Sequence, residues 1–160
     1  DGGLPGGPTP VRDLLNAGVN VGIGCDGATA GDHQSMWMET KTALLLSRLR
    51  EGTVQAMTAM DALWLATRGS AKALGREGNI GQLTLGANAD IATWKMDGIA
   101  YAGSLVDDVT ALLQGGPAQV WSSWVGGVPL VQEGKLVGVD VSAEVSRHSK
   151  SARRLQAFSQ

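Results

Sequence analysis

The sequence has 160 residues, with 13 Lys and Arg against 15 Asp and Glu, two His and one Cys, and 43% of its residues are hydrophobic. This length allows one ordinary domain or two small ones, and the formal net charge of −2 argues against nucleic acid or an anionic membrane as a partner. A single Cys and two His exclude an internal disulfide, a thiolate metal cage and a His-rich metal site built from this chain alone.

The first ten residues hold four Gly and three Pro and are predicted to form a loop. They lack an initiator Met and the basic and apolar stretches of a signal peptide, so we expect the sequence to begin internally. Gly or a charged residue interrupts every apolar run well before the roughly 18 residues of a membrane span. We therefore expect a soluble, cytoplasmic protein.

Helices around one buried strand are predicted for the first half of the chain. Apolar side chains at helical spacing indicate a short helix over residues 11–17, and β-branched residues with interspersed Gly indicate a strand over residues 19–25. The glycines of this strand would let other backbone or a ligand come close. Three more helices are predicted at residues 34–50, capped by Asp32 or Ser35, at residues 59–68 after a capping box from Thr58 to Asp61, and at residues 71–74.

From residue 78 on, closely spaced glycines separate short β-prone runs, which indicates a different packing unit. A hairpin is predicted around Gly126 and Gly127. The expected elements are strands at residues 91–95, 120–125, 129–132 and 136–139, a helical turn at 106–113 and a terminal helix at 142–157.

Asp26 is the candidate functional residue because it directly follows the predicted buried strand. Enzymes built on α/β sheets and barrels place catalytic groups at the carboxyl ends of their strands. An Asp in this position can equally cap a turn or a helix. The residues by themselves leave both interpretations open.

Other polar and aromatic residues give weaker signals. His33 lies in a polar loop, where a lone His is more often solvated than a ligand, and His148 is expected on the surface of the terminal helix. Cys25 has no basic neighbour in sequence and is expected to pack in the core. The five Trp residues could form a stacking platform, but their places on amphipathic helices and strands favour packing.

Three stretches, taken in order, resemble the C-terminal part of the amidohydrolase superfamily, in the branch of metal-dependent deaminases and chlorohydrolases. Residues 17–27 resemble the last barrel strand with its metal-site Asp, and residues 66–75 resemble the helical segment after it. Residues 81–92 match the Gly-x-Leu-x-x-Gly-x-x-Ala-Asp signature of the small β-domain. Within this branch, residues 101–103, 107–113 and 133–136 are most similar to the 8-oxoguanine deaminases.

The resemblance implies one divalent metal ion, zinc or alternatively iron, held by a His-x-His pair, a further His and the Asp of the eighth strand. Asp26 matches this Asp and would ligate the metal and take a proton from the metal-bound water that attacks the ring. The remaining ligands and the proton-donating Glu are implied to lie outside this chain.

The predicted fold class is therefore α/β: the C-terminal fragment of a (β/α)8 TIM-type barrel, with its last strand and following helices, plus part of a small β-sandwich domain. Residues 1–76 would form the barrel end, 77–140 the β-domain segment with a helical insert, and 141–160 a C-terminal helix. A complete barrel needs roughly 200 to 250 residues, so we expect the missing N-terminal part of the barrel as a partner and no activity from this chain alone.

The function predicted from the resemblance is deamination of a purine-like heterocycle of the 8-oxoguanine type by metal-activated water. A triazine chlorohydrolase or a cyclic amidohydrolase of the same superfamily is an alternative. A third alternative, from another class, is a non-catalytic structural or assembly module in which Asp26 is only a cap. We expect a small heterocyclic substrate and a homo-oligomer, with no nucleic acid or membrane as a partner.

Overall fold

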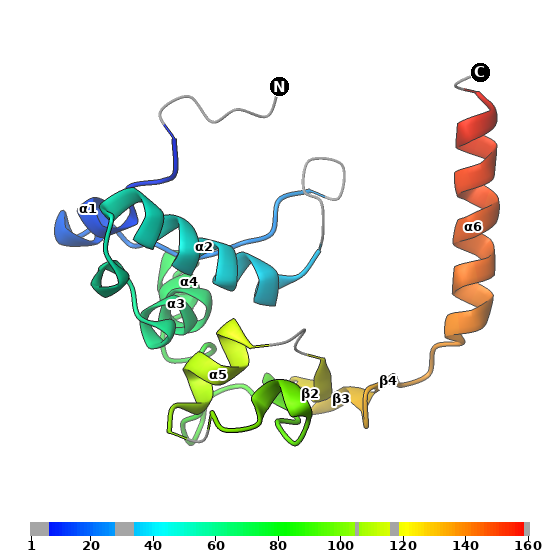
Figure 1. Ribbon diagram of the computed structural model, residues 1–160. Helices are drawn as coiled ribbons and strands as arrows, with labels where there is room; N and C mark the ends of the chain where they lie inside the picture. Colours follow the sequence, from blue (N-terminus) through cyan, green and yellow to red (C-terminus); the bar gives the residue numbers. More distant parts are fainter. Residues whose placement is uncertain (1–6, 28–33, 105, 116–118, 159–160) are drawn as a thin grey trace.

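The computed structural model describes residues 7–27, 34–104, 106–115 and 119–158 (Figure 1). Helices of the first half gather in one body, a small sheet lies beside it, and a long C-terminal helix stands away from both. The helices are α1 (Val11–Asn16), α2 (Met36–Glu51), α3 (Ala59–Trp64), α4 (Ser70–Ala73), α5 (Asp108–Gln114) and α6 (Val141–Ala157), with short 3-10 turns at Val54–Ala56 and Ile99–Tyr101.

Local capping signals set both ends of α2, and the helices predicted at residues 11–17 and 34–50 are confirmed as α1 and α2. The Ser35 hydroxyl accepts the N–H of Met38 at 3.3 Å and so starts α2. Gly52, with a φ of 68°, ends this helix in the left-handed conformation that glycine adopts without strain. Ser35 is therefore the cap, whereas Asp32 lies outside the described residues.

The capping box at α3 is also confirmed. The Thr58 hydroxyl accepts the Asp61 N–H at 3.1 Å, and the Asp61 carboxylate accepts the Thr58 N–H at 2.8 Å. The predicted break before Ser70 is wrong, because α3 runs directly into a π-helical turn, η2 (Leu65–Gly69), and then into α4. A single continuous helical stretch therefore spans residues 59–73.

Thr58→Ala is expected to lower the free energy of unfolding by about 1 kcal/mol at neutral pH, because the cap of α3 is lost. Hydrogen bonds from the Thr58 backbone and then from its side chain hold the pKa of Asp61 below its ordinary value of 3.8. A carboxyl whose pKa is lower in the folded state stabilises the fold above its unfolded pKa, and this contribution disappears as the pH falls through the folded pKa. Urea unfolding of both proteins should therefore show a difference that shrinks below pH 3.8. Asp61→Asn is the control, since it removes the titrating group, and an undiminished Thr58→Ala difference in acid would contradict the coupling.

The hydrophobic core lies where α2, α3, η2 and α5 meet. Its centre is fully buried, as Leu44 and Leu65 are 0% and 1% exposed. Val21 and Ile23, which belong to the segment before Asp26, pack against this centre while remaining partly exposed. The buried members of the cluster are Leu44, Met57, Ala59, Ala62, Leu65 and Leu113.

The predicted strand at residues 19–25 is wrong as an element of secondary structure. No strand among the described residues pairs with this segment, and a strand exists only through backbone hydrogen bonds to a neighbour. The side chains nevertheless keep the alternation of a strand, with Val21, Ile23 and Cys25 half-buried between exposed positions. The segment is thus less buried than predicted, and it has no sheet around it.

Four antiparallel strands form the sheet, in the order β1-β2-β3-β4. The predicted hairpin is confirmed, because Val125 pairs with Val128 across Gly126 and Gly127, whose φ values are 57° and 81°. The described residues contain only this one layer of the expected β-sandwich, and the last strand is shorter than predicted. The strands are β1 (Ile91–Trp94), β2 (Val120–Val125), β3 (Val128–Gln132) and β4 (Lys135–Leu136).

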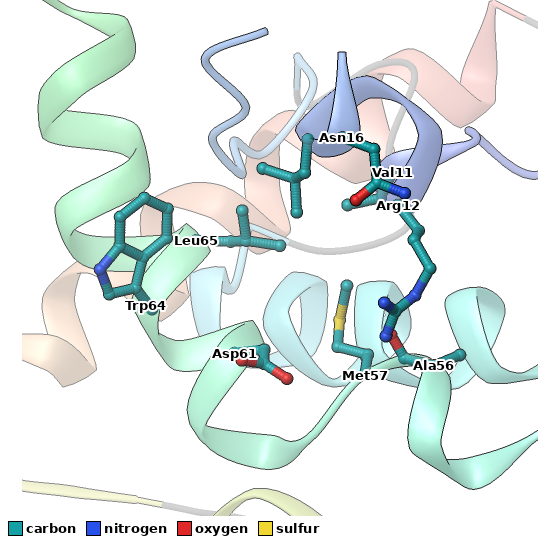
Figure 2. A pocket seen from close by; sticks show the side chains of 9 residues that line it. Val11, Arg12, Asn16, Ala56, Met57, Asp61, Trp64 and Leu65 are labelled. Carbon is teal, nitrogen blue, oxygen red and sulfur yellow. The ribbon is translucent and has the colours of Figure 1, made fainter. Parts of the chain in front are cut away.

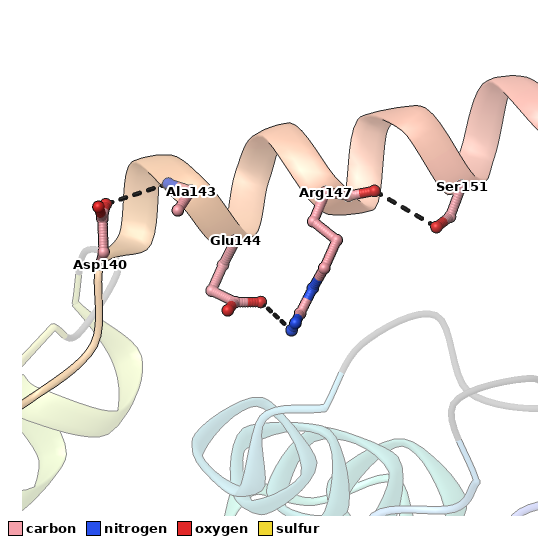
Figure 3. A network of polar contacts seen from close by, with 5 residues as sticks. All are labelled: Asp140, Ala143, Glu144, Arg147 and Ser151. Carbon is pink, nitrogen blue, oxygen red and sulfur yellow. Dashed lines mark hydrogen bonds and ion pairs between the residues drawn. The ribbon is translucent and has the colours of Figure 1, made fainter.

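Helix α6 is formed by local interactions along its own length (Figure 3). The Asp140 carboxylate caps it by accepting the Ala143 N–H at 3.0 Å, and Arg147 pairs with Glu144 one turn before it. None of the residues of α6 is buried, and His148 is exposed as predicted. Within the described ranges, no helix has both the length and the apolar character needed to cross a bilayer.

Candidate functional site

Asp26 lies exposed at the end of the segment 19–27, immediately after the half-buried Cys25. Its Oδ1 accepts the N–H of Gly27 at 2.7 Å, and its main-chain oxygen accepts the Gln34 side-chain amide at 2.8 Å. The following helix is capped by Ser35, so Asp26 does not serve as a helix cap. Its carboxylate is an exposed oxygen donor.

A contact with the helical stretch fixes the segment before Asp26. The N–H of Ile23 donates to the Ser70 hydroxyl at 3.0 Å, and this hydroxyl lies 3.0 Å from the Ile23 carbonyl oxygen. Glycine makes the close approach possible on both sides. A Cβ on Gly22 would lie 2.7 Å from the Ser70 Cα, and one on Gly69 would lie 2.6 Å from the Val21 oxygen.

Sequence reasoning anticipated part of this contact and missed the rest. The interspersed glycines predicted that other backbone would approach the segment, and Gly22 confirms this prediction. Ser70 gave no signal of its own in the sequence, where it only precedes the short helix predicted at residues 71–74. The signal that could have predicted the contact is a polar residue within a later helix that packs on a glycine-containing apolar segment.

The donor set within the described residues is incomplete for a metal ion. No group of three or more His, Cys, Asp and Glu side chains comes together in the described part of the chain. An exposed carboxylate such as Asp26 suits a divalent cation as one ligand, since it offers a hard oxygen without apolar cover. Asp26 is thus suited to be a single ligand of a metal site. His33, together with the Ala30 and Gly31 beside it, lies outside the described residues.

Two cavities lie beside the helices of the described structure, and Asp26 lines neither of them. One of about 260 Å³ lies between the segment at Val21–Gly24 and helix α2. Another of about 180 Å³ lies between α1 and α3 and is shown in Figure 2. Its cation, the Arg12 guanidinium, already donates to the carbonyl oxygens of Gln55 at 3.1 Å and Ala56 at 2.7 Å. This guanidinium is therefore already engaged with main-chain oxygens of the loop before α3.

Three of the five tryptophans make ring contacts, two with each other and one with a lysine. The rings of Trp37 and Trp94 lie 4.9 Å apart at 41°, which joins α2 to β1. The Lys95 ammonium lies 3.9 Å from the centre of the Trp121 ring. The packing predicted from their sequence positions is borne out for these residues.

Comparisons with known proteins agree with this arrangement. Residues 4–137 match the amidohydrolase family. The 8-oxoguanine deaminase of Pseudomonas aeruginosa is 39% identical over 154 residues, which cover 96% of this chain and 34% of that protein. The resemblance seen in residues 17–27, 66–75 and 81–92 is thereby confirmed.

Solved structures give the same result. A zinc-bound adenosine deaminase from Xanthomonas campestris superposes with a TM-score of 0.84 at 28% identity, over 92% of this chain and 34% of its own. A zinc complex of atrazine chlorohydrolase from Arthrobacter aurescens TC1 superposes with a TM-score of 0.82 at 31% identity, over 90% and 32%. The chain spans about a third of the length of each of these proteins.

Proposed function

The chain belongs to the amidohydrolase family, and we propose that it is the C-terminal part of a metal-dependent aminohydrolase that deaminates a purine-like ring of the 8-oxoguanine type. The observation that carries this proposal is the 39% identity to an 8-oxoguanine deaminase along nearly the whole chain. In this reaction water replaces an exocyclic amino group, which leaves as ammonia, and a ring carbonyl remains.

We propose that the segment 19–27 becomes the last strand of the barrel once the rest of the barrel lies beside it, and that Asp26 stands at its catalytic end. The alternation of half-buried and exposed side chains supports this proposal, as does the packing of Val21 and Ile23 on the helical core. Residues 1–76 would then form the barrel end, 77–140 the β-domain segment and 141–160 the C-terminal helix. The rest of the barrel would come from polypeptide outside this chain.

In the completed site, Asp26 would be one ligand of a divalent metal ion, for which zinc is our proposal. Bound zinc supplies a positive charge that lowers the pKa of its water toward neutrality. The Gly27 N–H, at 2.7 Å, holds Oδ1 of Asp26 in a fixed direction. A carboxylate held in this way can also accept the proton of the attacking water and pass it toward the leaving amino group.

The test is a hybrid in which this chain is joined to the part of the Pseudomonas deaminase that lies outside the matched region. With zinc present, the hybrid is expected to release ammonia from 8-oxoguanine, whereas the 160-residue chain alone should release none. Turnover by the chain alone would contradict the incomplete donor set. A folded, zinc-loaded hybrid that acts on no ring substrate would favour the assembly module instead.

A triazine chlorohydrolase is the second candidate, because the atrazine enzyme superposes as well as the deaminase does. The same hybrid, offered atrazine, would then release chloride rather than ammonia. We retain a homo-oligomeric state and a cytoplasmic location as further predictions.

A further inference from the structure

We propose that Ser70 is a positioning residue, which acts through Ile23 to fix the direction in which the Asp26 carboxylate is presented. This inference rests on the proposed function for the role of Asp26. It concerns a helix residue that lies 44 positions along the chain from Asp26 and that touches neither metal nor substrate.

The hydroxyl of Ser70 makes hydrogen bonds to the segment of the kind that the backbone of a neighbouring strand would make. A strand residue normally hydrogen-bonds through its N–H and its C=O to the backbone of the next strand. In Ile23, by contrast, the N–H donates to the Ser70 hydroxyl and the C=O can accept from it, each at 3.0 Å. Because a hydroxyl carries a single hydrogen, it accepts from the Ile23 N–H and donates to one carbonyl oxygen at a time.

The hydrogen bonds between Ser70 and Ile23, here called the clamp, are connected to the hydrophobic core. The second carbonyl within reach of the Ser70 hydroxyl is that of Leu65, at 2.9 Å, and Leu65 is 1% exposed. Ser70 follows the π-helical turn directly, which brings its side chain against the segment. Bare glycine backbone at positions 22 and 69 lets helix and segment approach more closely than any Cβ would allow. The segment is therefore tied to the most buried part of the molecule.

The hydrogen bonds at Ile23 restrain the position of the backbone at Asp26. Asp26 follows three residues later, about 10 Å along a strand-like chain. On its far side, the Gln34 amide holds the Asp26 carbonyl oxygen at 2.8 Å. The carboxylate therefore sits between two anchors, of which Ser70 is the half-buried one. Metal ligands tolerate little displacement, and loss of a residue that orients a ligand typically weakens metal binding by 10- to 100-fold.

Three variants test the proposal. Ser70→Ala removes the hydroxyl, and Ser70→Thr keeps it. Thr67→Ala is the matched control, because its hydroxyl donates to the Leu63 carbonyl at 2.7 Å in the same helical stretch without a hydrogen bond to residues 19–27 in the described structure. Amide hydrogen exchange of Ile23 is measured in the 160-residue chain, and the zinc dissociation constant is measured in the hybrid by competition with a chromophoric chelator.

Ser70→Ala should speed exchange at Ile23 by about tenfold, as expected for one lost hydrogen bond, and weaken zinc binding by about tenfold. Ser70→Thr should restore both values, and Thr67→Ala should change neither. Unchanged exchange at Ile23 would overturn the clamp. A second outcome is that Ser70→Ala speeds exchange at Ile23 without changing zinc affinity, while Asp26→Asn weakens zinc binding. This outcome would overturn the positioning role of Ser70 and leave the proposed function intact. Unaltered zinc affinity in Asp26→Asn would overturn the proposed function and the role of Ser70 with it.

Discussion

Replacing Asp26 with Asn in the completed enzyme is expected to lower kcat/KM for the ring substrate by about 10³-fold, because the proton acceptor is lost. Asn keeps the size of the side chain and an oxygen that can accept the Gly27 N–H. Asp26 accepts this N–H at 2.7 Å. It removes the negative charge that suits a divalent cation, so zinc affinity should fall as well. Ammonia release and zinc titration measure the two effects separately.

Asp97→Asn is the matched control for this substitution. Asp97 is an exposed carboxylate whose ion pair with Lys95, at 3.8 Å, lies on the surface and contributes little. Its variant should therefore keep both zinc binding and turnover. If Asp26→Asn behaved in the same way as Asp97→Asn, the assignment of Asp26 as ligand and proton acceptor would be wrong.

Leu65→Ala should lower the free energy of unfolding by about 3 kcal/mol, since it empties space at the centre of the core. Leu65 is 1% exposed and packs with Leu44, Met57 and Leu113. The same substitution at Leu49, which is 74% exposed on α2, should cost about 0.5 kcal/mol or less. Urea unfolding of both variants gives the comparison. Equal losses would mean that this cluster is not the centre of the core.

Helix ends were the most predictable part of the fold, because their signals lie within a few residues of one another. Ser35 and the Thr58 capping box act on their own turn of chain, and each does in the structure what its sequence position indicated. The hairpin at Gly126 and Gly127 is predictable for the same reason.

Features that depend on distant parts of the chain were not predictable in this way. An apolar, β-branched run indicates a strand, but residues 19–25 become one only if another strand lies beside them. The hydrogen bonds of Ser70 to Ile23 join positions 47 residues apart. No local pattern predicts these bonds or the π-helical turn before Ser70. Asp26 was predicted from the sequence because strand ends are a recurrent place for catalytic groups. No group of three or more possible metal ligands in the described residues completes a site around it.

The backbone of residues 19–27 lacks a strand beside it in the described part of the chain, and Ser70 satisfies it at one position only. Gly22 and Gly24 add no side chains that could shield it. Such bare peptide groups are the template on which polypeptides join into aggregates. A polypeptide that covered this edge would therefore have two effects through the same contact. It would complete the proposed metal site, and it would keep these peptide groups from pairing with other chains.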